Sequence, residues 1–117
     1  MSKIAQEKTF ENKIKRYITD QGGWVIKYFA NRMTKAGVPD LLACINGVFV
    51  AIEVKAQNGK ASELQLYNVE QIRKAGGIAI VLYPDQFGEF KQMVDKINGC
   101  MRYTFDEQKA FDREVRT

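Results

Sequence analysis

The chain has 117 residues, of which 45% are hydrophobic and 27% charged, and it carries a net charge of +4 at pH 7. This length supports one hydrophobic core, and the modest basic excess suits a polyanionic partner such as nucleic acid without requiring one. Because the sequence contains no histidine, we exclude Ser-His-Asp and Cys-His catalysis and His-ligated zinc, so hydrolysis would have to depend on carboxylates, lysine and a hard metal ion.

The first third of the sequence predicts a helix, a strand and a loop. Apolar residues recur at helical spacing over residues 4–21, and Gly22-Gly23 ends that pattern. Residues 24–29 are rich in aromatic and β-branched side chains, which favour a strand. A polar, basic loop is expected over residues 31–39.

A β-hairpin is predicted next. Two apolar runs, residues 41–45 and 48–54, are separated by Asn46-Gly47, and this dipeptide between hydrophobic runs is a strong signal for a two-residue hairpin turn. Both faces of the hairpin are apolar, so we expect its strands to be covered on both sides, with Cys44 buried as a small hydrophobic residue.

The remaining elements complete a mixed α/β pattern. Ser62 is a candidate N-cap for a helix ending near Ala75, and residues 78–82 form a buried strand candidate. A further helix is expected over residues 85–98. We therefore predict a single domain over residues 1–117, with a core over about 4–98 in which one mixed sheet is flanked by helices. In the C-terminal tail, residues 99–117, a short amphipathic helix could pack on the core or on a partner subunit.

The predicted hairpin brings two carboxylates together. Residues equally distant from the Asn46-Gly47 turn lie opposite each other, so Asp40 faces Glu53 across the ladder, and Lys55 projects from the same face. Two such carboxylates repel unless a cation lies between them, and Mg²⁺ prefers one or two carboxylates with water and phosphate oxygens. The alternative is an ordinary turn after Pro39 and a structural ion pair.

Two polar residues fall on helix faces that we expect to be buried. Gln65 lies between Val69 and Ile72 on the apolar stripe of the second helix, and Glu11 lies beside Ile14 and Ile18 on the first. Glu7, one turn earlier, competes with Glu11 for the same place. Gln65 and Glu11 are therefore candidates for the active site, and the alternative for each is a helix-edge position at the rim of the domain.

The assembled motifs are Pro39-Asp40, then Glu53-Val54-Lys55, then Gly59-Lys60-x-Ser62-x-x-Gln65. Together they resemble the VRR-NUC family of the PD-(D/E)XK nuclease superfamily, and the likeness is closest to its stand-alone phage and bacterial members. The resemblance covers about residues 11–82. It implies a restriction-endonuclease-like αβββαβ core and a metal-dependent endonuclease that hydrolyses DNA phosphodiester bonds.

The resemblance also assigns roles to individual residues. It implies that Asp40, Glu53 and the backbone carbonyl of Val54 bind Mg²⁺ or Mn²⁺, and that Lys55 acts at the attacking water. Glu11 matches the family's helix glutamate, which could assist a second metal ion. Gln65 matches a glutamine beside the site, where we expect it to hydrogen-bond Lys55 or the water.

The resemblance further implies a homodimer that cuts branched DNA such as four-way Holliday junctions. Three basic residues flank the site in sequence and are candidate contacts to DNA phosphates, although each is equally well explained as a solvated side chain: Arg32, Lys35 and Lys60.

Other functions remain open at this stage. The chain could be a non-catalytic nucleic-acid-binding module of the same fold, a structural protein whose carboxylates form ordinary ion pairs, or a nicking or non-specific nuclease. We expect a cytoplasmic location in a bacterial or phage-infected host cell, because the two cysteines suggest no disulfide framework and we find neither a signal peptide nor a membrane span.

Overall fold

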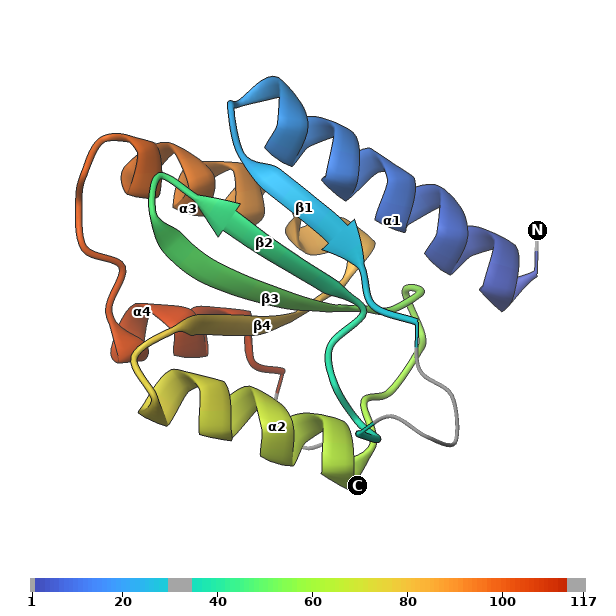
Figure 1. Cartoon of the computed structure of the whole chain (residues 1–117). Coiled ribbons are helices and arrows are strands. Elements are labelled where there is room, and N and C mark those ends of the chain that lie inside the picture. Colours follow the sequence, from blue (N-terminus) through green and yellow to red (C-terminus); the bar gives the residue numbers. More distant parts are fainter. Residues whose placement is uncertain (1, 30–34, 114–117) are drawn as a thin grey trace.

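The structure is a computed structural model that describes residues 2–29 and 35–113. Its helices and strands follow the predicted order, which confirms the α/β fold and agrees with a restriction-endonuclease-like core (Figure 1). The elements are α1 (Lys3–Asp20), β1 (Trp24–Lys27), β2 (Leu41–Ile45), β3 (Val48–Val54), α2 (Glu63–Lys74), β4 (Ile78–Leu82), the 3₁₀ turn η1 (Pro84–Gln86), α3 (Phe87–Asn98), α4 (Phe105–Gln108) and the 3₁₀ turn η2 (Lys109–Phe111).

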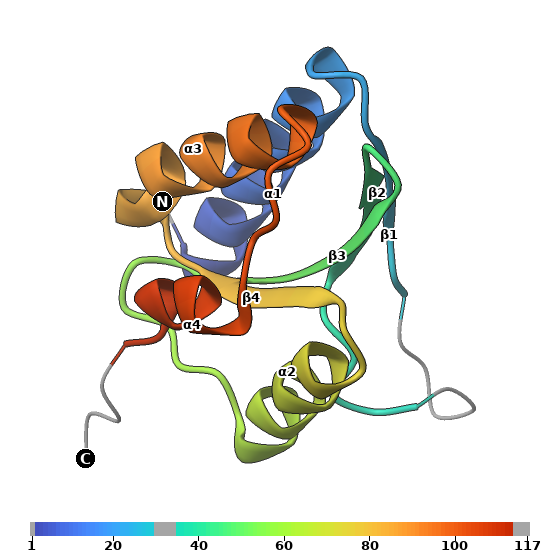
Figure 2. The ribbon, with the colours of Figure 1, turned by 90° about the vertical axis from the view of Figure 1, so that its left-hand side faces the viewer.

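The four strands form one mixed sheet in the order β1-β2-β3-β4, in which β1, β2 and β3 are antiparallel neighbours and β4 runs parallel to β3. Figure 2 shows α1 and α3 on one face of this sheet, and α2 and α4 on the other. The larger hydrophobic core lies between the sheet and the α1–α3 layer, and a smaller cluster lies beneath α2.

The hairpin register follows from the turn. Asn46 and Gly47 both have positive φ, 47° and 81°, as a type I′ turn requires, and Gly47 adopts this conformation without a steric penalty. Leu41 accordingly pairs with Ile52 and Cys44 with Phe49. The predicted register is therefore confirmed, and one further step along it places Asp40 beside Glu53.

One face of the hairpin is more open than expected. Cys44 is exposed and Phe49 is 45% exposed, so the prediction that Cys44 is buried is wrong. The reason is the position of α2, which packs over β3 and β4 and leaves β1 and the Cys44 end of β2 open on that side (Figure 2).

The C-terminal tail forms the short helix α4, beginning after the N-cap Thr104. The Gln108 side chain accepts a hydrogen bond from Ala79 N, at 2.9 Å, and donates one to Gly77 O, at 3.4 Å. The Nε of Arg73 donates to Ala79 O at 2.8 Å. The tail and Arg73 thus satisfy backbone groups along β4, which is an edge strand and would otherwise be open to pairing with another chain.

No helix within the described ranges is both long enough and apolar enough to cross a bilayer.

Candidate active site

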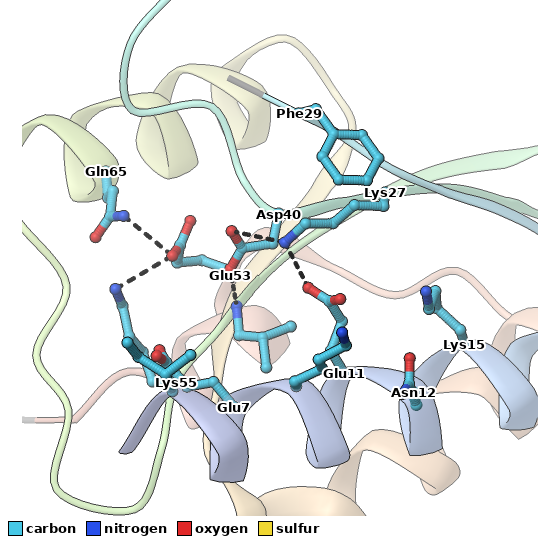
Figure 3. Close-up of a pocket in the computed structure, with 13 residues that line it drawn as sticks. Glu7, Glu11, Asn12, Lys15, Lys27, Phe29, Asp40, Glu53, Lys55 and Gln65 are labelled. Atoms are coloured by element: carbon cyan, nitrogen blue, oxygen red, sulfur yellow. Dashed lines mark hydrogen bonds and ion pairs between the residues drawn. The ribbon is translucent and has the colours of Figure 1, made fainter. Parts of the chain in front are cut away.

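An open pocket of roughly 580 Å³ lies where α1, the end of β1, the start of β2, the end of β3 and the start of α2 meet (Figure 3). The five residues that the sequence analysis placed at an active site all line this pocket: Glu11, Asp40, Glu53, Lys55 and Gln65. Val54 lines it as well. The fold therefore brings these residues together, while their chemical roles stay predictions.

Asp40 and Glu53 are held in different ways. Asp40 precedes β2, and its Oδ2 accepts a hydrogen bond from Val54 N at 2.9 Å, so the backbone of β3 fixes this carboxylate. Glu53 lies within β3, and its side chain is only 2% exposed. Its Oε2 accepts a hydrogen bond from Gln65 Nε2 at 3.0 Å and lies 3.2 Å from Lys55 Nζ.

The environment of Glu53 favours its protonated form. Burial raises the pKa of this carboxyl group, the neighbouring charge of Asp40 raises it further, and Lys55 opposes the shift; the result is a pKa of about 8. Its other oxygen, Oε1, is buried and has no hydrogen-bond partner among the described residues. A buried carboxylate with an unsatisfied oxygen is costly unless a cation or a proton compensates it.

Gln65 is held by the start of α2. Ser62 caps this helix in a capping box, in which Ser62 Oγ accepts from Gln65 N at 3.1 Å and Gln65 Oε1 accepts from Ser62 N at 2.8 Å. With its oxygen engaged in this way, the Gln65 side chain presents its NH₂ group to Glu53. From the sequence we expected Gln65 to hydrogen-bond Lys55 or the water. In the structure its protein partner at the site is Glu53.

A second lysine, Lys27, lies in the pocket and was missed by the sequence analysis. Its Nζ lies 2.6 Å from Glu11 Oε1 and 3.6 Å from Asp40 Oδ1. Partial burial lowers the pKa of Lys27, but the hydrogen bond to Glu11 and the two negative charges outweigh this effect and raise it. Lys27 therefore stays charged and neutralises the helix glutamate.

The candidate phosphate contacts are placed differently from what we expected. Arg32 lies outside the described residues, Lys35 does not line the pocket, and Lys60 lines a second pocket beside the β3–α2 loop. Two lysines of α1, Lys8 and Lys15, line the active-site pocket instead. Their helical spacing from Glu11 was the signal that could have identified them, because residues three and four apart share one face of a helix.

The pocket suits a divalent cation on the basis of its oxygen donors. The Oε1 of Glu53 lacks a partner within the described chain, and the Asp40 carboxylate lies next to it. Together the two carboxylates offer the hard oxygen ligands that Mg²⁺ prefers. In the part of the chain that the structure describes, no three Asp, Glu, Cys or His side chains converge to form a complete metal cage. This fits an ion that keeps several water and substrate ligands.

The ionisable side chains around the pocket balance in charge only when Glu53 is ionised. Four lysines line it, Lys8, Lys15, Lys27 and Lys55, together with four carboxylates, Glu7, Glu11, Asp40 and Glu53. A bound divalent ion would change this balance to a net charge of about +2, which would then favour a phosphate group.

The family model described as archaeal Holliday junction resolvase (hjc) matches residues 2–94. A search of curated proteins finds no match. The matched family lies within the PD-(D/E)XK superfamily expected from the motifs, but it is not the VRR-NUC family. The matched family is described as archaeal, whereas the motifs indicated phage and bacterial relatives. The match ends before the C-terminal tail.

Proposed function

Because the chain belongs to the archaeal Holliday junction resolvase (Hjc) family, whose members are Mg²⁺-dependent, structure-specific endonucleases acting as dimers, we propose that it resolves four-way DNA junctions with the pocket around Asp40 and Glu53. In this proposal two copies of the chain form a homodimer, and each copy cuts one of two opposed strands. The protein's location in the cytoplasm and its use of Mn²⁺ in place of Mg²⁺ remain predictions.

The residues of the pocket divide the chemistry between them. Asp40, Glu53 and the backbone carbonyl of Val54 would hold the metal ion, with Glu11 as a candidate for assisting a second ion. When bound, the metal ion lowers the pKa of a coordinated water and neutralises charge on the scissile phosphate. Lys55 positions the attacking water or stabilises the charge that develops on the phosphate oxygens. Gln65 orients the Glu53 carboxylate through its hydrogen bond.

One observation favours this proposal over the alternative functions. Glu53 is almost fully buried, next to a second carboxylate, and its Oε1 lacks a partner within the described chain. An ordinary structural ion pair would satisfy both oxygens, because an unsatisfied buried acceptor costs about 1–3 kcal/mol or more. A proton on Glu53 lessens that cost in the metal-free protein, and a metal ion shared with Asp40 would remove it. Two carboxylates meeting in an open pocket favour a catalytic site over a structural cluster or an inactive binding module.

The test is cleavage of a labelled four-way junction by the purified protein with Mg²⁺ or Mn²⁺, compared with plain duplex of the same sequence. We expect paired cuts in opposed strands of the junction and none in EDTA. Asp40→Asn and Lys55→Ala should each lower the cleavage rate at least a hundredfold while junction binding persists, because they remove charge at the reacting phosphate.

Lys109→Ala is the matched control, since Lys109 is an exposed residue of the tail. Junction binding without cleavage by the wild-type protein would instead establish the inactive binding module. Cleavage that continues in excess EDTA would rule out the metal mechanism.

A further inference from the structure

An exposed aromatic ring borders the catalytic pocket. Phe29 is 77% exposed and lines the pocket together with Lys27 and Asp40. Figure 3 shows its ring on the side of Lys27 and Asp40 that faces away from α1. An isolated exposed phenylalanine is common on protein surfaces, so its significance here depends on its position beside the proposed metal site.

The backbone positions the residue that precedes Phe29 relative to the catalytic carboxylate. Tyr28, the preceding residue, donates its N–H to Asp40 O at 2.7 Å, which continues the β1–β2 pairing beyond the last residue of β1. The Tyr28 hydroxyl also donates to Lys35 O at 3.4 Å. Phe29 therefore follows directly on the residue that is hydrogen-bonded to Asp40, and an extended chain places it about 7 Å beyond Lys27.

The opposite wall of the pocket is polar and charged. It is formed by α1, from which Lys8, Asn12 and Lys15 line the pocket together with Glu7 and Glu11, and Lys27 neutralises Glu11. Lysines that contact a nucleic-acid backbone, with an aromatic side chain beside them, form an arrangement by which proteins bind unpaired nucleotides. An apolar peptide segment fits this pocket less well, because most of the side chains facing Phe29 are charged or polar.

We propose that Phe29 is a stacking platform for a nucleobase, and that it receives a base that has left the helical stack at the branch point of the junction, next to the scissile phosphate. The α1 lysines hold the phosphates of that strand while the ring covers one face of the base. This inference rests on the proposed function, and it adds a reason for preferring a junction over duplex, since bases in intact duplex remain stacked on each other.

The test compares ring and non-ring substitutions at Phe29 in binding to a four-way junction, with Ca²⁺ replacing Mg²⁺ to limit cutting. Phe29→Leu keeps an apolar side chain without an aromatic face, and Phe29→Trp keeps the face. We expect Phe29→Leu to weaken junction binding about tenfold, the range found for loss of one stacked base, while Phe29→Trp binds like the wild type and duplex binding is unchanged in both. Tyr67→Ala is the control, because Tyr67 is a 58% exposed aromatic residue that does not line this pocket.

A second readout identifies the base. With 2-aminopurine placed at the branch point, addition of the wild-type protein or Phe29→Trp should change its fluorescence, and Phe29→Leu should not. Equal binding and equal fluorescence for Phe29→Leu and the wild type would overturn the stacking proposal. So would a loss of affinity that is the same for junction and duplex. Failure of the wild-type protein to bind or cut junctions would instead overturn the proposed function, so the two failures are distinguishable.

Discussion

The ammonium group of Lys27 lies 2.6 Å from Oε1 of Glu11, so a lysine at the end of an edge strand directly neutralises the glutamate of the first helix. Lys27 also lies 3.6 Å from Asp40. Glu11, which the family resemblance connects with a second metal ion, is thus paired with a lysine of the protein itself. Lys27 therefore sets the balance of charge between α1 and the metal site.

Replacing Lys27 with methionine should strengthen metal binding and slow cleavage. The substitution removes the ion-pair partner that Glu11 and Asp40 share, so the pocket becomes more negative and attracts a divalent ion more strongly. For a partly exposed charge we expect the Mn²⁺ dissociation constant to fall about three- to tenfold. The cleavage rate should decrease, because a cation near the substrate phosphate is lost.

Titration of Mn²⁺ into the wild type and Lys27→Met measures the first effect. Lys15→Met is the control, because Lys15 lines the pocket but, within the described residues, forms no ion pair with Glu11 or Asp40, so its loss should change Mn²⁺ affinity less. Weaker Mn²⁺ binding by Lys27→Met would show that Lys27 supports the metal site instead of competing with it.

Gln65 and Ser62 offer a pair of substitutions with the same structural cost and different effects on activity. Each forms half of the capping box, so Gln65→Ala and Ser62→Ala should each lower the free energy of unfolding by about 1 kcal/mol. Only Gln65 also contacts Glu53, so only Gln65→Ala should reduce the cleavage rate, by about tenfold.

Urea unfolding and single-turnover cleavage, measured on both variants, separate the two effects. Equal cleavage rates for Gln65→Ala and Ser62→Ala would mean that Gln65 contributes to the helix cap alone.

The raised pKa of Glu53 predicts a pH dependence of stability in the metal-free protein. Its pKa is about 8 in the folded protein, against an ordinary value of 4.5. Between these two values the folded state binds a proton that the unfolded state releases, so the free energy of unfolding falls as the pH rises through this window. The difference between these two pKa values corresponds to an effect on the order of 5 kcal/mol.

Urea unfolding at pH 5 and pH 8.5 in EDTA tests this dependence. Glu53→Gln cannot lose a proton, so it should be less sensitive to pH and more stable than the wild type at pH 8.5. Mg²⁺ should restore stability to the wild type at pH 8.5. The same pH slope in wild type and Glu53→Gln would contradict the assignment of the raised pKa to Glu53.

The contact between the tail and the edge strand predicts a stability effect without a catalytic one. The Arg73 side chain is 3% exposed and binds Asp112, with Nη2 at 2.8 Å from Oδ1, as well as the carbonyl group of Ala79. Arg73→Ala leaves these partners unsatisfied and should lower the free energy of unfolding by about 2–4 kcal/mol.

Lys109→Ala is the control within the same segment. Its ion pair with Asp106 is exposed, so the loss should be below about 0.5 kcal/mol. Both variants should cleave at the wild-type rate at a temperature where they are folded. A change below 0.5 kcal/mol for Arg73→Ala would show that the tail does not stabilise β4.

The sequence predicted the hairpin best, because local chemistry determines its register. Asn46 and Gly47 favour one type of turn, and a two-residue turn aligns every pair of residues up to Asp40 and Glu53. The Ser62 cap was predictable for the same reason, since residues three positions apart form the capping box. Each of these signals lies within a short stretch of sequence.

The position of Lys27 was not predictable in this way. The strand β1 pairs with β2 across a connection of thirteen residues, 28–40, and no turn dipeptide sets the register of such a long connection. The exposure of Cys44 was likewise not predictable from the sequence, because it depends on how far α2 extends across the sheet. Both features arise from tertiary packing, to which the periodicity of a single segment is insensitive.

The central claim is that Asp40 and Glu53 share a divalent metal ion, and calorimetric titration of the purified protein with Mn²⁺ at pH 8.5 tests it most directly. We predict that the wild type binds Mn²⁺ and that Asp40→Asn and Glu53→Gln each bind it at least tenfold more weakly. Glu63→Gln, which removes an exposed carboxylate at the start of α2, should bind like the wild type. Unchanged Mn²⁺ affinity in both Asp40→Asn and Glu53→Gln would contradict the account.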